Sequence, residues 1–241
     1  MYCSVGHMVD IGTEFVYRQM RYAVLSVDDH EVGLSGATTD LAGEVNIPSK
    51  VMFNGSEYTV VAICTLAFTD AGKVRSIRYP GTIRFLMSHA FAGAELDKDF
   101  QFPEDLEYVG GYHFAGSSGL RHVTIPKSIV DIPVGMFNDC LGLISVRMHS
   151  GVETIGDFAF MGCEDLSSVE TDESSDIDDP DGVVLPESVC EVGGSAFANT
   201  RISRIYTDAT IGHRYEDVPE FVRRADNSGL KRVRTGFMGS R

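Results

Sequence analysis

Tryptophan is absent from the 241-residue chain, and cysteine is scarce and scattered. The five cysteines are Cys3, Cys64, Cys140, Cys163 and Cys190. Their odd number and wide spacing argue against a framework of disulfides, and they form no C-x-x-C pair of the kind that binds zinc. We therefore expect buried, reduced thiols and predict no metal site.

Long apolar runs are also missing. No run approaches the roughly 18 residues that a membrane-spanning helix needs, so membrane insertion is not expected. The first residues, MYCSVGHMVDIGTEF, contain no basic segment followed by an apolar one, so no secretory signal is visible. Two explanations stay open: the protein remains inside the cell, or the export signal is missing from this sequence.

Positive charge is in deficit. The chain has 20 basic and 35 acidic residues, which gives a formal net charge of −15 at pH 7. The electrostatic field of such a chain repels nucleic acid and anionic membranes, so neither is an expected partner. Residues 213–241 reverse this balance, with seven Lys or Arg against four Asp or Glu.

Motifs that mark common enzymes are absent as well. The sequence has no G-x-S-x-G, H-E-x-x-H, G-x-G-x-x-G or G-x-x-x-x-G-K-[ST], and we expect no cofactor. His122, Cys140 and Asp99 form one imaginable nucleophile set. We reject it because Cys140 belongs to a buried column of the repeat described next, on the far side of the coil from His122. The sequence therefore predicts that the protein is not an enzyme.

The chain contains a repeated nine-residue motif, seen in ICTLAFTDA, LMSHAFAGA and IGDFAFMGC. Its phenylalanines lie 23 residues apart, except that the last follows after 37, which is one period plus a 14-residue insertion. They are Phe68, Phe91, Phe114, Phe137, Phe160 and Phe197. Prolines 80, 103 and 126 keep the same period, 12 residues after a phenylalanine. Repetition at 20–50 residues is typical of solenoids, propellers and other arrays.

Inside one period, the apolar spacing predicts a short strand followed by a wider turn. In LRHVTIPKSIVDIPVGMF, Leu120, Val123 and Ile125 have the spacing of the inward side of a strand. The pattern L-x-x-V-x-I matches the strand of a leucine-rich repeat, in which each coil adds one parallel strand to a concave sheet. A single coil cannot bury its apolar side, whereas stacked coils bury one another. The phenylalanines are therefore expected to stack in one buried column.

The consensus LxxVxIPxSVxxIxxxAFxxC resembles the BspA-like leucine-rich repeats, a family common among bacterial surface and secreted proteins. LRHVTIPKSIVDIPVGMFNDC and VETIGDFAFMGCEDLSSVE carry it most clearly, and residues 45–68 look like a first repeat with a short hairpin inserted after Pro48. We predict a strand-rich α/β fold, a right-handed leucine-rich-repeat solenoid with a parallel concave β-sheet and short turns or 3-10 segments on the convex side. The resemblance further implies a secreted or cell-surface location and a role in adhesion or host interaction.

Three parts are expected along the chain: an N-terminal β cap at 1–44, a solenoid of about six coils at 45–212, and a C-terminal helical cap with a basic tail at 213–241. Alternating apolar and polar residues in FVYRQMRYAVLSV predict a β-hairpin in the first part. The stretch EDVPEFVRRADNSG predicts a short helix, with Asp217 as its N-cap and Gly229 as its stop.

The insertion ETDESSDIDDPDG, residues 170–182, is acidic at seven of its thirteen positions. Asp176, Asp178 and Asp181 suggest a calcium loop, because clustered carboxylates are the ligands that calcium prefers. Their spacing departs from the D-x-D-x-D-G pattern by one residue, and Pro180 stands where a ligand is needed. We therefore predict a solvated acidic loop.

Basic side chains fall at outward positions of four adjacent predicted strands. They are Arg75, Arg78, Lys98, Arg121 and Arg147, with His122 at the centre of the stripe. Two interpretations stay open: strand surfaces carry such residues for solubility, or the stripe attracts an acidic protein or glycan. From the second we predict a non-enzymatic binding module that recognises a protein or surface polymer through its concave face. A self-assembling structural scaffold is the alternative, and an uncharacterised enzyme is the third hypothesis.

Overall fold

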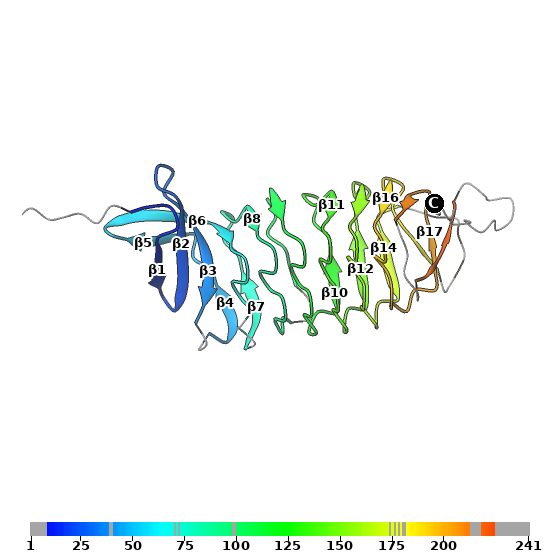
Figure 1. The fold of residues 1–241 in the computed structure, drawn as a ribbon, viewed down its shortest axis with the longest axis horizontal. Coiled ribbons are helices and arrows are strands. Elements are labelled where there is room, and N and C mark those ends of the chain that lie inside the picture. Colours follow the sequence, from blue (N-terminus) through cyan, green and yellow to red (C-terminus); the bar gives the residue numbers. More distant parts are fainter. Residues whose placement is uncertain are drawn as a thin grey trace, which may run out of the picture.

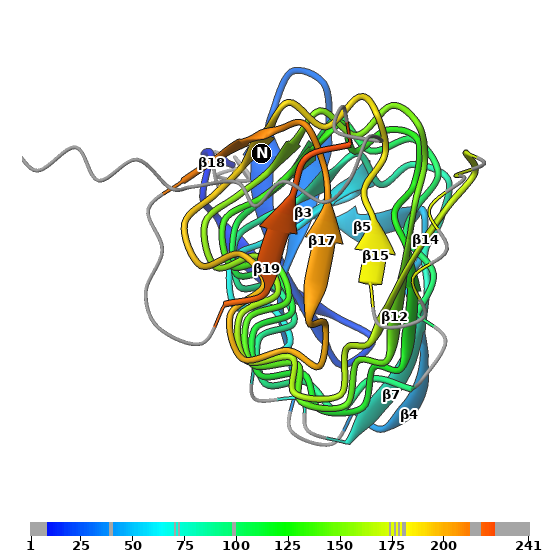
Figure 2. The ribbon, with the colours of Figure 1, turned by 90° about the vertical axis from the view of Figure 1, so that its right-hand side faces the viewer.

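The computed structural model describes residues 9–38, 41–69, 71, 73–97, 100–173, 175, 177, 179, 182–212 and 218–224. The chain winds into a row of stacked coils along one long axis, with the N-terminal strands at one end (Figure 1). Viewed along this axis, successive coils lie over one another (Figure 2). All regular structure in the described part of the chain is β-strand, so the fold is strand-rich without the α component of the predicted class. The right-handed coiling stays a prediction.

The N-terminal end is built from two antiparallel hairpins. Strands β1 (Glu14–Tyr17) and β2 (Met20–Ser26) form the first, which confirms the hairpin predicted in the cap. Strands β5 (Lys50–Phe53) and β6 (Ser56–Ile63) form the second, after Pro48 as predicted. Its turn, Asn54-Gly55, has positive φ at both residues (48° and 82°), as a two-residue hairpin turn requires. Strand β3 (Glu31–Ala37) joins them, because it is antiparallel to β2 and parallel to β6.

The predicted strand of each coil forms a first strand column. Its members are β4 (Gly43–Asn46), β7 (Val74–Arg78), β10 (His122–Thr124), β12 (Ser145–Met148) and β14 (Ser168–Thr171). β4 pairs with β7, and β10, β12 and β14 form a parallel sheet in the register of the repeat. β15 (Gly182–Val184), β17 (Arg204–Tyr206) and β19 (Glu220–Val222) form a further parallel sheet after the insertion.

Among the described residues, the first strand column is interrupted between β7 and β10. The coil between β7 and β10 has no strand among its described residues 97 and 100–102. This coil carries Phe100 and Phe102 at the positions that Val123 and Ile125 occupy one coil later. Both rings pack edge-on against Phe114, with centroids 4.7 Å and 5.6 Å away.

A second strand column follows the turn of each coil and was missed by the sequence analysis, which predicted only turns there. Its strands are β8 (Phe85–Leu86), β9 (Tyr108–Val109), β11 (Asp131–Ile132), β13 (Thr154–Ile155), β16 (Glu191–Val192) and β18 (Thr210–Ile211). β6, β8 and β9 are paired in sequence, as are β11, β13, β16 and β18. The column is interrupted between β9 and β11.

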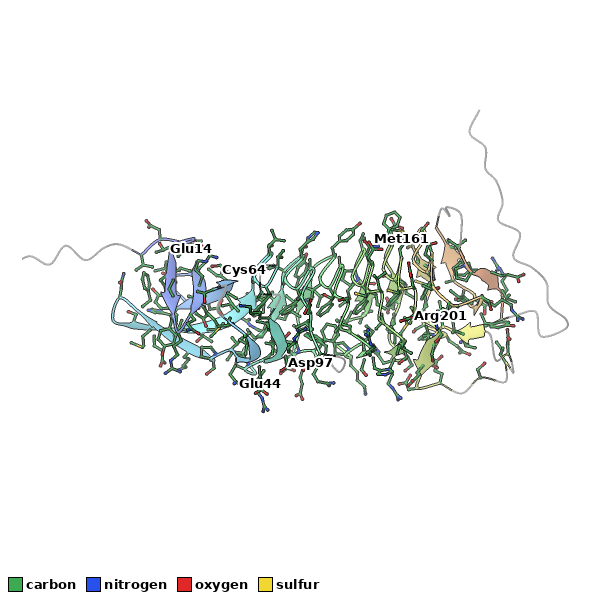
Figure 3. The ribbon with its side chains drawn as sticks, turned by 90° about the horizontal axis from the view of Figure 1, so that it is seen from below. Glu14, Glu44, Cys64, Asp97, Met161 and Arg201 are labelled. Atoms are coloured by element: carbon green, nitrogen blue, oxygen red, sulfur yellow. The ribbon has the colours of Figure 1, made fainter. Side chains whose placement is uncertain are left out.

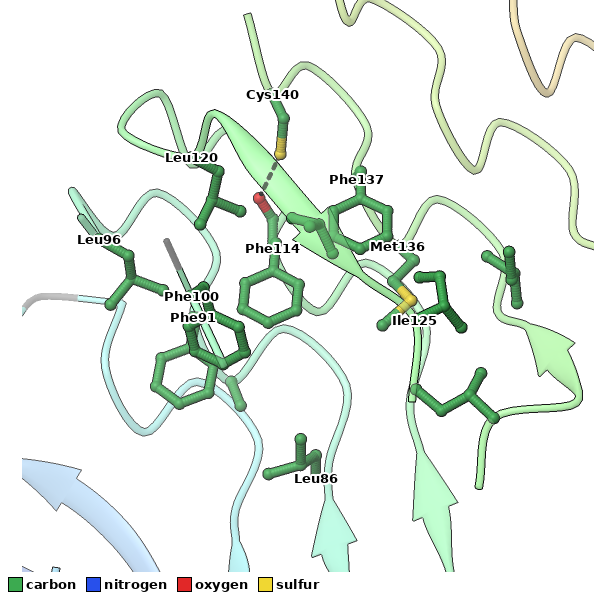
Figure 4. Packing of buried hydrophobic residues seen from close by; sticks show 14 of the residues in the cluster. Leu86, Phe91, Leu96, Phe100, Phe114, Leu120, Ile125, Met136, Phe137 and Cys140 are labelled. Carbon is green, nitrogen blue, oxygen red and sulfur yellow. Dashed lines mark hydrogen bonds between the residues drawn. The ribbon is translucent and has the colours of Figure 1, made fainter. Parts of the chain in front are cut away.

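The predicted phenylalanine column is confirmed. All six rings are at most 1% exposed, and each stacks on the next. Centroid separations along the column are 5.0, 5.7, 5.5, 5.4 and 5.1 Å. Figure 4 shows Phe91, Phe114 and Phe137 within this core. Because Phe160 stacks directly on Phe197, the 14-residue insertion leaves the core unbroken.

In three coils, a buried polar side chain three residues after a phenylalanine bonds to the previous coil. The Cys140 thiol donates to the Phe114 carbonyl at 3.1 Å (Figure 4). The Cys163 thiol donates to the Phe137 carbonyl at 3.0 Å, and the Ser117 hydroxyl donates to the Phe91 carbonyl at 2.9 Å. Burial raises the pKa of Cys163 to about 12, so the thiol stays protonated. Cys140 and Cys163 are free and buried, as predicted, but Cys190 is exposed.

Asp179 is one of the residues that hold the acidic insertion against the coils. Asp179 accepts a hydrogen bond from the Tyr206 hydroxyl at 2.8 Å and pairs with Arg204 at 3.0 Å. The proposed calcium ligands Asp176, Asp178 and Asp181 lie outside the described residues.

The C-terminal helix prediction is wrong where the structure describes the segment. Glu220–Val222 form strand β19, which pairs in parallel with β17. Phe221 and Val222 are 5% exposed, so this strand covers the last coil of the core. Asp217 and Gly229, the predicted ends of the helix, lie outside the described residues.

We predict that Phe114→Ala lowers the free energy of unfolding by about 3–5 kcal/mol, the range for a cavity left by a core phenylalanine. Leu141→Ala is the control, because its side chain is 48% exposed; the change should stay near 0.5 kcal/mol. Urea unfolding followed by circular dichroism measures both. Equal effects would contradict the central role of the column.

A second prediction concerns His113, which is fully buried and donates from Nδ1 to the Met87 carbonyl at 2.9 Å. Burial lowers the pKa of His113 from 6.5 to about 4. The unfolded chain therefore binds a proton at a higher pH than the folded chain, and stability is lost as the pH falls below 6.5. This effect amounts to about 2 kcal/mol between pH 7 and pH 5.

His113→Met is the matched variant, because Met136 occupies the same position one coil later. The variant loses one hydrogen bond at neutral pH, at a cost of about 1 kcal/mol. Its stability should then approach that of the parent as the pH falls to 5. A gap between the two proteins that is independent of pH would show that His113 is not neutral in the fold.

The difference in exposure between the cysteines predicts selective alkylation. Under native conditions iodoacetamide should modify the exposed Cys190 and leave Cys140 and Cys163 unreacted until denaturant is added. Peptide mapping without reduction measures this. A crosslinked Cys140–Cys163 peptide would refute the assignment.

Candidate binding surface on the strand face

The outward-facing residues of β7, β10, β12 and β14 form a surface that we call the strand face. Arg75 and Arg78 lie on β7, His122 on β10 and Arg147 on β12, while Arg121 immediately precedes β10. Four of the six predicted site residues thus lie on strands of the first strand column, Arg121 lies next to one of them, and Lys98 lies outside the described residues. In Figure 2, β7, β12 and β14 line one side of the coils, and β18 of the second strand column lies on another.

Three of the arginines are paired with carboxylates, which the sequence analysis missed. Arg75 pairs with Glu95 at 2.6 Å, Arg78 with Glu44, and Arg147 with Glu170. Each partner comes from a neighbouring coil, so only stacking brings the charges together. Figure 3 shows the Glu44 side chain on the same side of the coils as Asp97, away from Met161.

These pairs lower the positive field of the face without removing its donors. The arginine side chains remain 49%, 72% and 61% exposed in Arg75, Arg78 and Arg147. The hydrogen bond to Glu44 and its charge raise the pKa of Arg78, so the guanidinium stays charged. Exposed pairs of this kind are weak, at about 0–1 kcal/mol each, and can exchange for a partner's carboxylate or sulfate.

Arg121 is held by the backbone. Its Nη1 donates to the carbonyls of Ser118 and Leu120 at 2.9 and 3.2 Å. A Cβ added to Gly142 would lie 1.4 Å from the same nitrogen, so the guanidinium rests against the bare Cα of this glycine. The glycine therefore allows the fixed position of the Arg121 side chain.

A depression of about 610 Å³ lies where the first strand column is interrupted. Arg75 and Arg121 line it together with Glu95, Asp97 and Gly119. A Cβ on Gly119 would meet the Leu96 carbonyl oxygen at 1.9 Å, so the close approach of the coils requires a glycine here. The two arginines thus border a depression that the carboxylates of Glu95 and Asp97 also line.

His122 has a polar neighbour but no catalytic setting. Its Nδ1 lies 2.9 Å from the Ser145 hydroxyl, and its side chain is exposed on β10. Cys140, the nucleophile imagined with it, is buried and hydrogen-bonded to a carbonyl, and burial raises the pKa of its thiol well above the usual range. Asp99, the third member, lies outside the described residues.

The described part of the chain contains no group of three or more His, Cys, Asp or Glu side chains placed to hold a metal ion. It contains no helix long and apolar enough to span a membrane.

Comparison with known families identifies the family to which the chain belongs. Residues 58–180 match the BspA type leucine rich repeat region in six copies. This match covers 123 of 241 residues, and the chain therefore belongs to the BspA-type leucine-rich repeat family. No match to a curated protein was found.

Three crystal structures of bacterial proteins share the fold. A leucine rich cell surface protein from Faecalibacterium prausnitzii is 18% identical, with a TM-score of 0.53 over 84% of this chain and 73% of its own. The T. pallidum leucine rich repeat protein is 23% identical, with a TM-score of 0.56 over 78% of this chain and 89% of its own. A leucine-rich repeat protein from Eubacterium ventriosum is 19% identical, with a TM-score of 0.59 over 79% of this chain and 50% of its own. At these identities the likeness concerns the fold alone.

Proposed function

We propose that this chain is a non-enzymatic binding module that recognises an acidic segment of a protein or glycan through the strand face. The main observation in support is the depression bordered by Arg75 and Arg121, where hydrogen bonds to backbone carbonyls hold guanidinium groups from two coils in fixed places. The family supports a repeat scaffold for protein interaction. Parallel strands present side chains at even spacing on a rigid surface, which suits recognition across several coils.

A cell-surface setting is part of the proposal. It is supported by the printed description of the Faecalibacterium prausnitzii protein as a leucine rich cell surface protein. In such a setting, adhesion to a host or neighbouring-cell polymer is the role that suits the strand face.

Self-assembly is the second candidate, because the N-terminal end exposes apolar side chains. Ile11, Val16 and Met52 are 72%, 65% and 50% exposed. Exposed apolar residues at a solenoid end favour contact between ends. Light scattering over a concentration series separates the candidates, since a strict monomer excludes self-assembly.

The strand face should bind acidic probes in a salt-dependent way. We expect heparin fragments or poly-glutamate to bind the protein and the affinity to fall as salt rises above physiological strength, where the screening length is about 8 Å. Arg75→Gln with Arg121→Gln should weaken binding about tenfold, mostly by slowing association, because exposed charges act on encounter. Surface plasmon resonance measures both rate constants, and the two probes distinguish a glycan from a protein ligand.

The control removes the same amount of charge elsewhere. Lys73→Gln with Lys127→Gln alters two exposed lysines that do not line the depression. If this control pair weakens binding and the arginine pair does not, the site assignment is wrong.

A further inference from the structure

The interruption of the second strand column has a simple chemical cause. In the other coils, the residue after the strand donates its N–H to the previous coil. Gly110 donates to Leu86, Gly156 to Ile132 and Gly193 to Ile155, at 2.8, 2.8 and 2.7 Å. The equivalent residue after β11 is Pro133, which has no N–H to donate to Val109. Within the described residues, which include both strands, no backbone hydrogen bond joins β9 to β11.

The break is local. The next bond along the same two coils, from the Tyr112 N–H to the Val134 carbonyl, is present at 2.9 Å. One proline thus separates two strands while the coils stay stacked on either side. The carbonyls of Glu107 and Val109 keep no backbone donor from β11.

A groove of about 380 Å³ lies at this break. Tyr108 and Val109 of β9 line it on one side, and Val130, Asp131 and Pro133 line it on the other. Tyr108 is 49% exposed and Val130 is 37% exposed, so the groove offers an aromatic ring and an aliphatic side chain to solvent. Exposed apolar groups gathered in a concavity are typical of interaction sites.

The charged groups that line the groove are the carboxylates of Glu107 and Asp131, and the hydroxyls of Tyr108 and Ser128 are its neutral polar groups. Asp131 accepts a hydrogen bond from the Thr154 hydroxyl at 2.6 Å and has no cation within 4 Å among the described residues. Glu107 shares Arg84 with Glu31, with nitrogen–oxygen distances of 3.3 and 2.6 Å. Two carboxylates therefore meet one arginine near the groove, and Asp131 makes no ion pair with the described residues.

We propose that the groove binds an arginine side chain carried by an extended, basic segment of a partner protein. Asp131 is the acceptor for the guanidinium, and Tyr108 is the ring against which its flat face stacks. A guanidinium brings five donors in one plane, which suits a site of carboxylate and carbonyl acceptors beside an aromatic ring. Lysine brings a compact ammonium without a flat face, so arginine is the preferred residue.

This site is independent of the strand face. The groove lies in the second strand column, and the strand face belongs to the first. The two also favour opposite charges, because the strand face offers guanidinium donors and the groove offers carboxylate acceptors.

The test uses capped heptapeptides of valine and threonine with arginine, lysine or citrulline at the centre. Amide chemical shifts of the ¹⁵N-labelled full chain measure their affinities. The arginine peptide should shift the amide resonances of residues 107–109 and 130–132, and bind about tenfold more tightly than the uncharged citrulline peptide, as for the loss of one good ion pair. Equal affinity for arginine and citrulline, or no arginine binding at millimolar peptide, would overturn the proposal.

Matched variants locate the site. Asp131→Asn keeps an acceptor for Thr154 and should weaken arginine binding about tenfold. Glu191→Gln is the control, because Glu191 occupies the same column two strands away, and it should leave binding unchanged. Arg75→Gln with Arg121→Gln should also leave it unchanged, which separates this proposal from the one for the strand face. The opposite ranking of Asp131 and Glu191 variants would refute the site.

Pro133→Ala tests the cause of the groove. The alanine supplies the missing N–H, so β9 and β11 should pair and the amide at position 133 should become protected from hydrogen exchange. Arginine binding should then weaken while the fold persists. A protected amide with undiminished binding would show that the open break is not part of the site.

Discussion

Every coil of this protein depends on its neighbours, because one coil has no layer of its own under which to bury its apolar side. The phenylalanine column provides the central contact, and the backbone follows the same geometry. The amides of Phe91, Phe114 and Phe137 donate to the carbonyl of the residue before the next phenylalanine, at 3.0, 2.9 and 2.8 Å. Ring stacking and hydrogen bonding thus impose one spacing on all coils, which is why a 14-residue insertion between Phe160 and Phe197 leaves the stack intact.

A uniform stack makes its irregularities informative. Among the described residues, the first strand column is interrupted between β7 and β10, in the coil that carries Phe100 and Phe102, and the second is interrupted where Pro133 replaces a donor of the ladder. A depression lies at each interruption, lined by Arg75 and Arg121 in one case and by Tyr108 and Asp131 in the other. In a repeat scaffold the regular positions maintain the core, and the departures from the repeat produce the concave features that a ligand can enter.

The charges of the strand face also depend in part on the repeat pattern of the sequence and in part on the stacking of the coils. The basic stripe was visible in the sequence because its members recur at fixed positions. The ion pairs that partly neutralise this stripe were not predicted, because Glu44, Glu95 and Glu170 approach the arginines from other coils. The strand face therefore carries ion pairs at three of the arginines of the predicted basic stripe.

The sequence alone was enough to predict the repeat, the buried phenylalanine column, the N-terminal hairpin and the reduced state of Cys140 and Cys163, because these follow from periodic spacing and local alternation. The prediction failed for the C-terminal segment, where Asp217 as an N-cap and Gly229 as a stop suggested a helix but pairing with β17 made Glu220–Val222 a strand. The stacking of the coils sets which strands pair, which carboxylates reach the arginines and where the grooves lie. These features depend on contacts between residues about one period apart in sequence, whose distances are set by stacking and not by any local preference of the chain.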